Sequence, residues 1–452
     1  MLDVNKGSKS LSGFDITCSW RRLFIATAVL LVVGVSAGNA NAESLGDLLP
    51  GVVKNDDVVK AAQAEFAAKK QEEKVVFGQW YPTLAVTANY GHEKQKPETA
   101  DDTTLVTRDV NLSVTQLIWD FGNVNSQVRE KRMEAAEVAA RLKDARQTIM
   151  RDVILAYINV LRFDQTIQIA ERAIEIIVEQ GRLEESRLKI GAGTSTDVLK
   201  AKSKLASQED LRVSLLKQLR TAKNAYRETT KSKPPAVKNM VRPRLPLDLM
   251  PGSVEEAIKL AMRDNPLLLS GRITSFINRQ KVSTARAAGF FPKVEGVVED
   301  KYKEDFGGAI GKERELLTKL QMSYSFNLGG TAINTLRQNK ETAKQWLSTY
   351  TEARNRTEEL VRNAWDKLRT SQERVKILTD GLAIHSKSLE LVRKDRKKGK
   401  STVLEVLDAI AQLTVAEGSL AFEEAEVLGA AYELLYAMGR LNLAVVGGVP
   451  LK

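Results

Sequence analysis

The sequence predicts a mainly α-helical protein with a β-barrel part, in which long antiparallel coiled-coil hairpins join four transmembrane β-strands per chain. Two stretches without proline, between Pro97 and Pro234 and between Pro292 and Pro450, leave room for very long helices, because proline breaks a helix. Apolar residues in each stretch recur at alternating spacings of three and four, which is typical of a helix packed along a partner helix. The two stretches also match each other at a constant offset, which indicates a duplicated unit.

The N-terminus of the 452-residue chain has the order of a secretory signal peptide. Arg21-Arg22 precedes the apolar run 23–37, and Ala40-Asn41-Ala42 follows as a small-residue cleavage site. This run is short for a membrane span, which favours a signal peptide over the alternative of a membrane anchor. We therefore assign residues 1–42 to a signal peptide. Its cleavage would remove Cys18, the one cysteine of the sequence, and would exclude a disulfide from the mature protein.

An internal repeat organises the rest of the chain. At an offset of 208 residues, similar residues recur along both halves. The offset pairs Gly122 with Gly330, Gly191 with Gly399, Thr194 with Thr402 and Leu199 with Leu407. This period is too long for a solenoid, so one large unit is present twice. The mature chain divides into a first repeat (43–230), a Pro- and Lys/Arg-rich connector (231–252), a second repeat (253–445) and a C-terminal tail (446–452).

Each repeat contains a long helix followed by a return helix. The apolar seam of the first long helix comprises Ile149, Val153, Ala156, Val160, Phe163, Ile167, Ala170, Ile174 and Ile177. The seam of the second comprises Val361, Ala364, Leu368, Ser371, Val375, Leu378, Leu382, His385, Leu389 and Val392. The seams predict helices over about 123–190 and 331–398, each roughly 100 Å long. Return helices are expected over about 196–229 and 403–440.

A short polar tip joins each long helix to its return helix. The first tip comprises Gly191, Gly193 and Thr194 with Asp197 just beyond, and the second comprises Gly399 and Thr402 with Glu405 just beyond. Glycine adopts the left-handed conformation that ends a helix, and threonine caps the next helix. The two acidic residues fall in the first turn of the return helices, where a negative charge is favourable beside the helix dipole.

Two stretches with strand periodicity precede each long helix. They lie at about 83–92, 107–118, 293–302 and 316–326. Apolar residues alternate there with small or polar residues, as in the strands of a membrane barrel. The predicted lipid face comprises Leu84, Val86, Tyr90, Leu112, Val114, Leu320, Met322, Tyr324 and Phe326. Asp300 interrupts the apolar face of the third strand, and alternation alone leaves a half-buried soluble sheet as the alternative.

The number of strands constrains the assembly. Four strands cannot close a membrane barrel, because closure needs about eight or more. Open strand edges are not tolerated in lipid. If these strands span a membrane, several chains must share one barrel, and three chains would supply about twelve strands.

Composition and motifs indicate that the chain is not an enzyme. The net charge of +11 is diluted over a long chain, and we expect no nucleic-acid partner. Two histidines and one cysteine exclude most multi-ligand zinc sites, so we expect neither a metal nor a cofactor. Gly311-Lys312 is followed by glutamate, which departs from a phosphate-binding loop. We therefore assign no catalytic residue.

Several motifs together resemble the TolC family of outer-membrane channel proteins over the whole mature chain. They are the tandem repeat, Tyr81-Pro82 and Phe291-Pro292 before strands, Gln116–Gly122 before the first long helix, Ala156–Leu161 within it, and the patterns around Gly191 and Gly399. The second half departs from the family pattern at Asn327–Gly330, where the aromatic-Asp element is missing, and in the very basic stretch before Gly399.

The resemblance implies a homotrimer with a twelve-strand barrel in the lipid of the outer membrane and a helical tunnel reaching into the periplasm. It implies a passive exit duct for a tripartite efflux pump or a type I secretion system. A periplasmic adaptor protein is expected to dock at the helical tips and to link the duct to an inner-membrane pump or ABC transporter. The expected docking residues are Arg187, Gly191, Gly193, Thr194, Asp197, Gly399, Lys400, Thr402 and Glu405.

The resemblance also implies an acidic constriction at the periplasmic entrance, which an iris-like movement of the inner helices opens. Glu390 matches this place, Asp395 is the nearby competitor, and an exposed helix surface is the alternative for Glu390. A ring of three carboxylates on the axis would favour cations. The competing function is a periplasmic coiled-coil scaffold or adaptor without a membrane barrel. Small-molecule efflux and protein secretion both remain open.

Overall fold

The computed structural model describes residues 44–96, 98–99 and 101–446. The predicted signal peptide (1–42) and residues 447–452 of the predicted tail lie outside the described residues. Among the residues described, no helix combines the length and the apolar character needed to cross a membrane.

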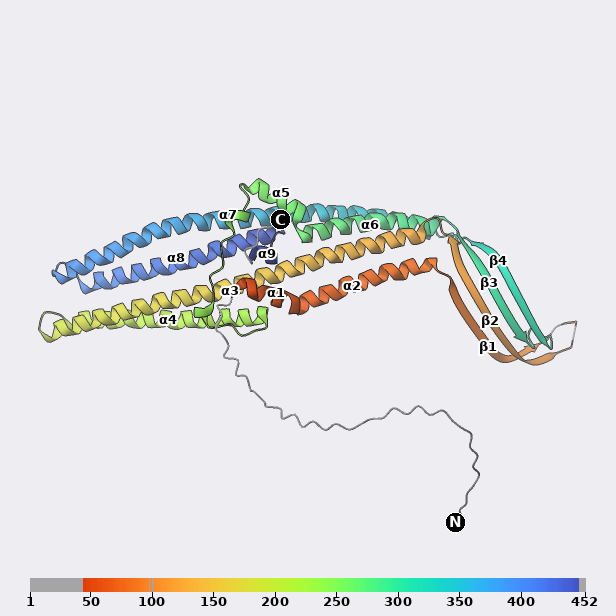
Figure 1. The fold of residues 1–452 in the computed structure, drawn as a ribbon, viewed down its shortest axis with the longest axis horizontal. Helices are drawn as coiled ribbons and strands as arrows, with labels where there is room; N and C mark the ends of the chain where they lie inside the picture. The colour runs from red at the N-terminus through yellow and green to blue at the C-terminus, as the bar shows by residue number, and fades with distance from the viewer. Residues whose placement is uncertain (1–43, 97, 100, 447–452) are drawn as a thin grey trace, which may run out of the picture. The chain divides into compact units, whose positions relative to one another are not determined.

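Both repeats follow the same order of two helices, two strands and two helices (Figure 1). The first repeat comprises α1 (Leu45–Asn55), α2 (Asp57–Phe77), β1 (Thr83–Gln95), β2 (Thr103–Trp119), α3 (Asn123–Lys189) and α4 (Ser195–Thr230). The second comprises α5 (Val254–Asp264), α6 (Pro266–Phe290), β3 (Lys293–Glu304), β4 (Lys312–Ser323), α7 (Thr331–Lys397) and α8 (Val403–Ala437), followed by the short α9 (Leu443–Val446). The predicted fold class, long helical hairpins joined to four strands, is confirmed.

The four strands form one antiparallel sheet in the order β1-β2-β3-β4. Its register pairs Leu84 with Val114, Val114 with Val298, and Val298 with Thr318. Paired residues point to the same side of a sheet, so these four residues form one row on one face. β1 and β4 are the two edges of the sheet.

β4 ends earlier than the sequence pattern predicts. It begins at Lys312 and stops at Ser323, so Tyr324 and Phe326 follow the strand, and their placement on it is wrong. The reason lies in the neighbouring strand: β3 begins at Lys293, which pairs with Ser323, and offers no ladder partner beyond that point. The two aromatic side chains therefore lie at the helix end of the sheet, both more than half exposed.

The long helices form one curved layer, here called the wall, with four neighbouring helices near the sheet and four near the tips. On the sheet side, α2 packs on α3, α3 on α6, and α6 on α7. On the tip side, α4 packs on α3, α3 on α8, and α8 on α7. α3 and α7 extend from the sheet to the tips, whereas α2 lies in line with α4 and α6 in line with α8 (Figure 1). The strand and seam patterns did not predict α2 and α6.

The predicted seams are the buried faces of α3 and α7. Val153, Val160 and Ile177 on α3 are fully buried or nearly so. On α7, Val361 and Leu368 are buried in the main core, and Leu389 packs near the tip with residues of α8. Alternation of three and four residues keeps one stripe facing the partner helix, which explains why the pattern located these contacts correctly.

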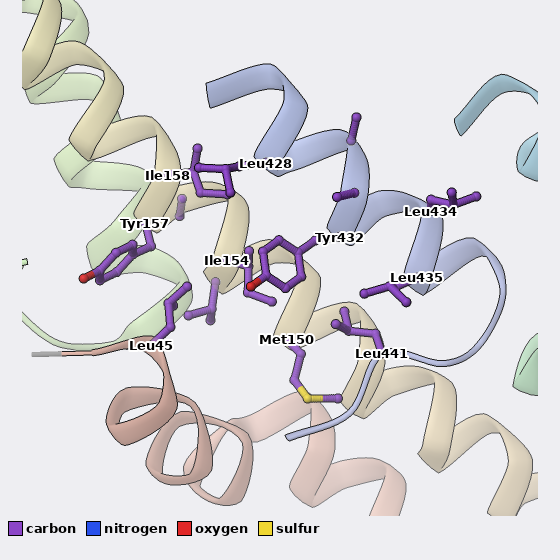
Figure 2. Close-up of a cluster of buried hydrophobic side chains, with 14 of the residues drawn as sticks. Leu45, Met150, Ile154, Tyr157, Ile158, Leu428, Tyr432, Leu434, Leu435 and Leu441 are labelled. Carbon is purple, nitrogen blue, oxygen red and sulfur yellow. The ribbon is translucent and has the colours of Figure 1, made fainter. Parts of the chain in front are cut away.

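The larger of the two core clusters lies at the middle of α3, where it packs against the C-terminal end of α8, and it includes Met150, Ile154 and Leu435 (Figure 2). Two tyrosines of this core hold the connector. The hydroxyl of Tyr157 donates to the carbonyl oxygen of Val241 at 2.9 Å, and that of Tyr432 donates to the carbonyl oxygen of Arg244 at 2.9 Å. The connector is therefore bound across both repeats rather than freely solvated.

Candidate functional site

The first helical tip is a tight turn set by glycine and threonine. Gly191 has φ +73°, and the N–H of the next residue donates to the Arg187 carbonyl oxygen at 2.9 Å, which closes the end of α3. A side chain at Gly193 would meet Arg187 Cβ and Leu188 N at 3.1 Å. Thr194 then caps α4, since its hydroxyl accepts the N–H of Asp197 at 3.2 Å.

The second tip repeats this geometry with a stronger cap. Gly399 has φ +76°, and the N–H of Lys400 donates to the Asp395 carbonyl oxygen at 2.8 Å. Thr402 accepts the N–H of Glu405 at 3.3 Å, and the Glu405 carboxylate accepts the N–H of Thr402 at 3.1 Å. This reciprocal pair satisfies two backbone donors at the start of α8.

A buried ion pair joins the two hairpins just above the tips. Glu184 of α3 is 1% exposed, and its carboxylate accepts two hydrogen bonds from Arg396 of α7, at 2.6 Å to Nη2 and 3.3 Å to Nε. Gln180 donates to the same carboxylate at 2.7 Å. Arg396 also donates to the Ser401 carbonyl oxygen at 3.2 Å. A bidentate, buried Arg–carboxylate pair is strong, directional and costly to break.

Two predicted docking residues turn toward this pair. Asp197 Oδ2 lies 3.7 Å from Arg396 Nη2, and Arg187 Nη1 lies 3.7 Å from Glu184 Oε1. Arg187 also reaches the Arg396 carbonyl oxygen at 3.5 Å. These side chains contribute to the contact between hairpins, while Lys400 remains exposed at the tip.

Glu184 was missed by sequence reasoning, although the seam contained a signal for it. The spacing that runs through Ile174 and Ile177 continues to Gly181 and Glu184, and the α7 seam continues from Val392 to Arg396. A charge on an apolar seam requires a buried partner. Glu184 at the end of one seam and Arg396 at the end of the other are therefore the partners that this pattern predicts.

Glu390 lies on the exposed side of α7 between two lysines. Its carboxylate is 2.8 Å from Lys387 Nζ and 2.6 Å from Lys394 Nζ. Hydrogen bonds from both lysines lower the pKa of Glu390 to about 2. Asp395, five residues further along α7, is half-buried. Both carboxylates lie near the tip, and their place relative to a channel axis stays a prediction.

The sheet has one apolar and one polar face. The predicted lipid-face residues that lie on strands, from Leu84 to Met322, all share one side in the observed register. On the other side, Glu299 pairs with Lys301 at 2.6 Å and with Lys319 at 3.0 Å, and Asn89 donates to Asp109 at 3.0 Å. This segregation suits a wall between lipid and water.

Aromatic side chains mark the helix end of the sheet. Phe121 stacks on Phe291 with ring centroids 5.3 Å apart, and Trp119 meets Phe121 edge-on at 6.0 Å. Tyr81 and Phe77 form a further edge-on pair at 6.0 Å. Such belts are typical of barrel residues at a membrane–water boundary.

Among the residues described, no group of three or more His, Cys, Asp or Glu side chains is placed to hold a metal ion.

Known proteins share this architecture. The family model described as outer membrane efflux protein matches residues 48–230 and 257–440, which is most of the chain. The outer membrane efflux protein BepC of Brucella suis biovar 1 is 23% identical over 425 residues, covering 94% of this chain and 91% of BepC. The protease secretion protein PrtF of Dickeya chrysanthemi is 23% identical and covers 92% of both chains.

Solved channels have the same fold. The outer-membrane channel OprN superposes with a TM-score of 0.78 at 20% identity, covering 87% of this chain and 89% of OprN. The MtrE outer membrane channel of Neisseria gonorrhoeae in its open state has a TM-score of 0.73 at 18% identity, covering 90% and 93%. The chain belongs to the outer membrane efflux protein family, whose members are passive channels of the outer membrane with helical tunnels that extend into the periplasm.

Proposed function

We propose that three copies of this chain close into one exit duct, opened at its periplasmic tip by an adaptor and an inner-membrane pump or ABC transporter. The observation that carries the proposal is the open wall: its sheet has edge strands β1 and β4, each paired on one side in the described chain. In lipid, unpaired backbone groups are very costly, so β4 of one copy must pair with β1 of the next. Three copies supply about twelve strands, enough for a barrel.

The helical edges of the wall support the same closure. On α7, Ile377 and Ile384 are 69% and 68% exposed, and Leu391 follows at the same seven-residue spacing. On α4, at the opposite edge, Leu199 and Val213 are also exposed. Apolar stripes at heptad spacing indicate a missing partner helix. We assign α4 of the neighbouring copy to the exposed stripe of α7.

The buried pair Glu184–Arg396 is proposed as the contact that opening must break. It joins α3 to α7 at the level where the two hairpins end, so the hairpins cannot separate while it is intact. An adaptor that docks on the exposed tip residues could compensate for the loss of this contact. Glu390 and Asp395 remain our candidates for the acidic entrance ring.

The transported substrate follows from the partner pump. BepC is named as an efflux protein and PrtF as a protease secretion protein, and both match nearly the full chain. We propose the same duct for either use. The alternative of a periplasmic scaffold leaves the exposed apolar face of the sheet without a partner.

The decisive experiment uses cysteine labelling in the purified protein reconstituted in lipid. With Cys18 in the predicted signal peptide, a mature chain offers no competing thiol. A spin label at Leu112→Cys, on the apolar face, should be accessible to oxygen and shielded from a water-soluble nickel complex. Asn111→Cys, the next residue and on the opposite face, is the matched control and should show the reverse. A water-exposed label at position 112, or a soluble monomer in cell fractionation, would refute the duct.

A further inference from the structure

Basic residues on the apolar face of the sheet gather at one end. In the observed register this face carries four of them, Lys94, Arg108, Lys312 and Arg314. Arg108 lies in one row with Tyr90 and Lys312, and Arg314 lies in the adjacent row beside Tyr302. Lys94 lies beyond both rows toward the turn. Toward the helix end, the described strand residues on this face are uncharged apart from Asp300.

This cluster occupies the outer boundary of the membrane. The helical tunnel extends into the periplasm, so the hairpin turns at the far end of the sheet face the cell exterior. Along β3, Phe291 of the aromatic belt and Tyr302 are about 36 Å apart at 3.3 Å per residue, or about 28 Å across the membrane at a strand tilt near 40°. That span matches an apolar band, so the basic rows lie level with the headgroups of the outer leaflet.

The cluster carries a net positive charge despite its internal pairs. Arg314 forms a bidentate pair with Asp300 at 2.8 and 3.0 Å, and Arg108 reaches Glu304 at 3.5 Å. Lys312 lies 3.8 Å from the same Glu304. Four basic and two acidic residues leave two positive charges in excess per chain. The cations remain open to solvent or lipid, since the Arg314 side chain is 74% exposed and that of Lys312 66%.

A groove beside these residues provides room for an amphiphile. It has a volume of about 390 Å³ and is lined by Val110, Leu112, Tyr302, Lys312 and Arg314, together with Asp300 and Glu313. Apolar lining residues suit an acyl chain, while arginine and lysine suit phosphate oxygens. Exposed charges at the edge of an apolar band need a partner of opposite sign in the same layer.

We infer that this cluster is a binding site for the phosphorylated glycolipid of the outer leaflet, lipid A. Its phosphates contact Lys94, Arg108, Lys312 and Arg314, and one acyl chain follows the groove over Val110 and Leu112. Three copies of the site surround the trimer. The inference rests on the lipid-facing side assigned in the proposed function.

The test is lipid retention by the purified, delipidated trimer in native mass spectrometry. The wild-type protein should retain up to three molecules of added lipid A. It should bind dephosphorylated lipid A, which lacks the phosphates, and phosphatidylglycerol, which carries a single phosphate charge, at least about ten-fold more weakly, since each Lys or Arg adds to the attraction for an anionic headgroup. The triple variant K94Q/R108Q/K312Q leaves the Asp300–Arg314 pair intact and should lose about ten-fold in lipid A retention. The matched control K189Q/K397Q/K398Q removes three exposed cations near the helical tips and should retain lipid A as the wild type does.

Three results would overturn the inference: equal retention by the triple variant, equal binding of dephosphorylated lipid A, or equal binding of phosphatidylglycerol. The comparison of lipids on the wild-type trimer decides the matter even if the triple variant fails to assemble. The spin label at Leu112→Cys separates the two proposals. A lipid-accessible label with no lipid A selectivity refutes this site alone, whereas a water-exposed label refutes the duct as well.

Discussion

The two repeats begin their long helices after a glycine with positive φ, but with different side chains beside it. Gly122 and Gly330, one residue before α3 and α7, have φ +84° and +72°. In the first repeat the buried carboxylate of Asp120 accepts the N–H groups of Gly122 and Val124. In the second, the amide oxygen of the exposed Asn327 accepts the N–H of Gly329 at 2.7 Å. The missing aromatic-Asp element is thus replaced by a weaker neutral turn at the same place.

The polar faces of the two strand pairs differ in how many charged side chains they carry. β1 and β2 line that face with mostly neutral groups such as Thr87, Ser113 and Thr115. β3 and β4 line it with a ladder in which Lys319, Glu299 and Lys301 alternate in sign. The two halves share the order of their elements and differ in the charge on this face. The glycines and the seams therefore carry the fold, and charged side chains distinguish the halves.

The largest effect is expected where the repeats meet, at Glu184 and Arg396. Arg396→Gln leaves the Glu184 carboxylate buried without its cation and should cost about 3–5 kcal/mol in the closed tip. We expect a larger single-channel conductance in bilayers. The double variant E184Q/R396Q should recover part of the loss, because two neutral amides can still bond. An unchanged conductance in Arg396→Gln would show that this pair does not hold the tip closed.

The two helix starts should respond unequally. Asp120→Ala removes two hydrogen bonds to backbone N–H groups and should destabilise the protein by about 1–2 kcal/mol, whereas Asn327→Ala should cost well under about 1 kcal/mol. Thermal unfolding of the trimer, followed by circular dichroism, measures both. Asp120→Asn serves as the intermediate control. Equal shifts for the two alanine variants would remove the distinction between the junctions.

The charge of Glu390 should persist in acid. Its pKa is lowered from 4.5 to about 2, so the group stays ionised as pH falls from 7 to 4, and its pairing with Lys387 and Lys394 is lost only as pH approaches 2. If Glu390 lines the entrance, Glu390→Gln lowers cation preference in single-channel recordings equally at pH 7 and pH 4. Glu341→Gln, which removes an exposed Lys344 partner on the same helix, is the control. Unchanged selectivity in Glu390→Gln would exclude it from the ring.

The smallest effect is expected at a solvent-exposed ionic contact between the hairpins. Lys204 of α4 lies 3.8 Å from Asp408 of α8, and Asp408 is about half exposed. Solvent-exposed pairs contribute little, so Asp408→Asn should change stability by less than about 0.5 kcal/mol and leave the conductance unchanged. A loss of stability in Asp408→Asn as large as that in Arg396→Gln would contradict the expectation that buried ion pairs contribute more than exposed ones.

Sequence patterns predicted the parts of the fold that are periodic. The seams from Ile149 and Val361 located the long helices because every third or fourth residue is buried against one partner. α2 escaped prediction because it lies at the edge of the wall, where Val59 is its one buried residue among those described. The predicted end of β4 was wrong because the length of a strand depends on where its partner strand begins. The alternation that includes Tyr324 and Phe326 carries no information about the start of β3.

The candidate site was predicted in its turns and missed in its contacts. Gly191, Thr194, Gly399 and Thr402 occupy the caps that their residue types indicated. The pairing of Glu184 with Arg396 depends on how two hairpins pack, which neither helix encodes alone. The same holds for the connector, where Tyr157 and Tyr432, which composition identifies only as core residues, donate hydrogen bonds to backbone carbonyl oxygens.

The two tyrosine hydrogen bonds attach the connector to α3 and α8 near the middle of α3. Beyond this attachment, each hairpin extends toward its tip as a long arm. From Tyr157 to Gly191 the helix extends about 50 Å at 1.5 Å per residue. A rotation of α3 by about 5° at Tyr157 would therefore displace the tip by about 4 Å. This displacement is more than enough to separate Glu184 from Arg396. A small bend of α3 at this level would therefore be large enough at the tip to break the contact between the hairpins, without any change in the sheet.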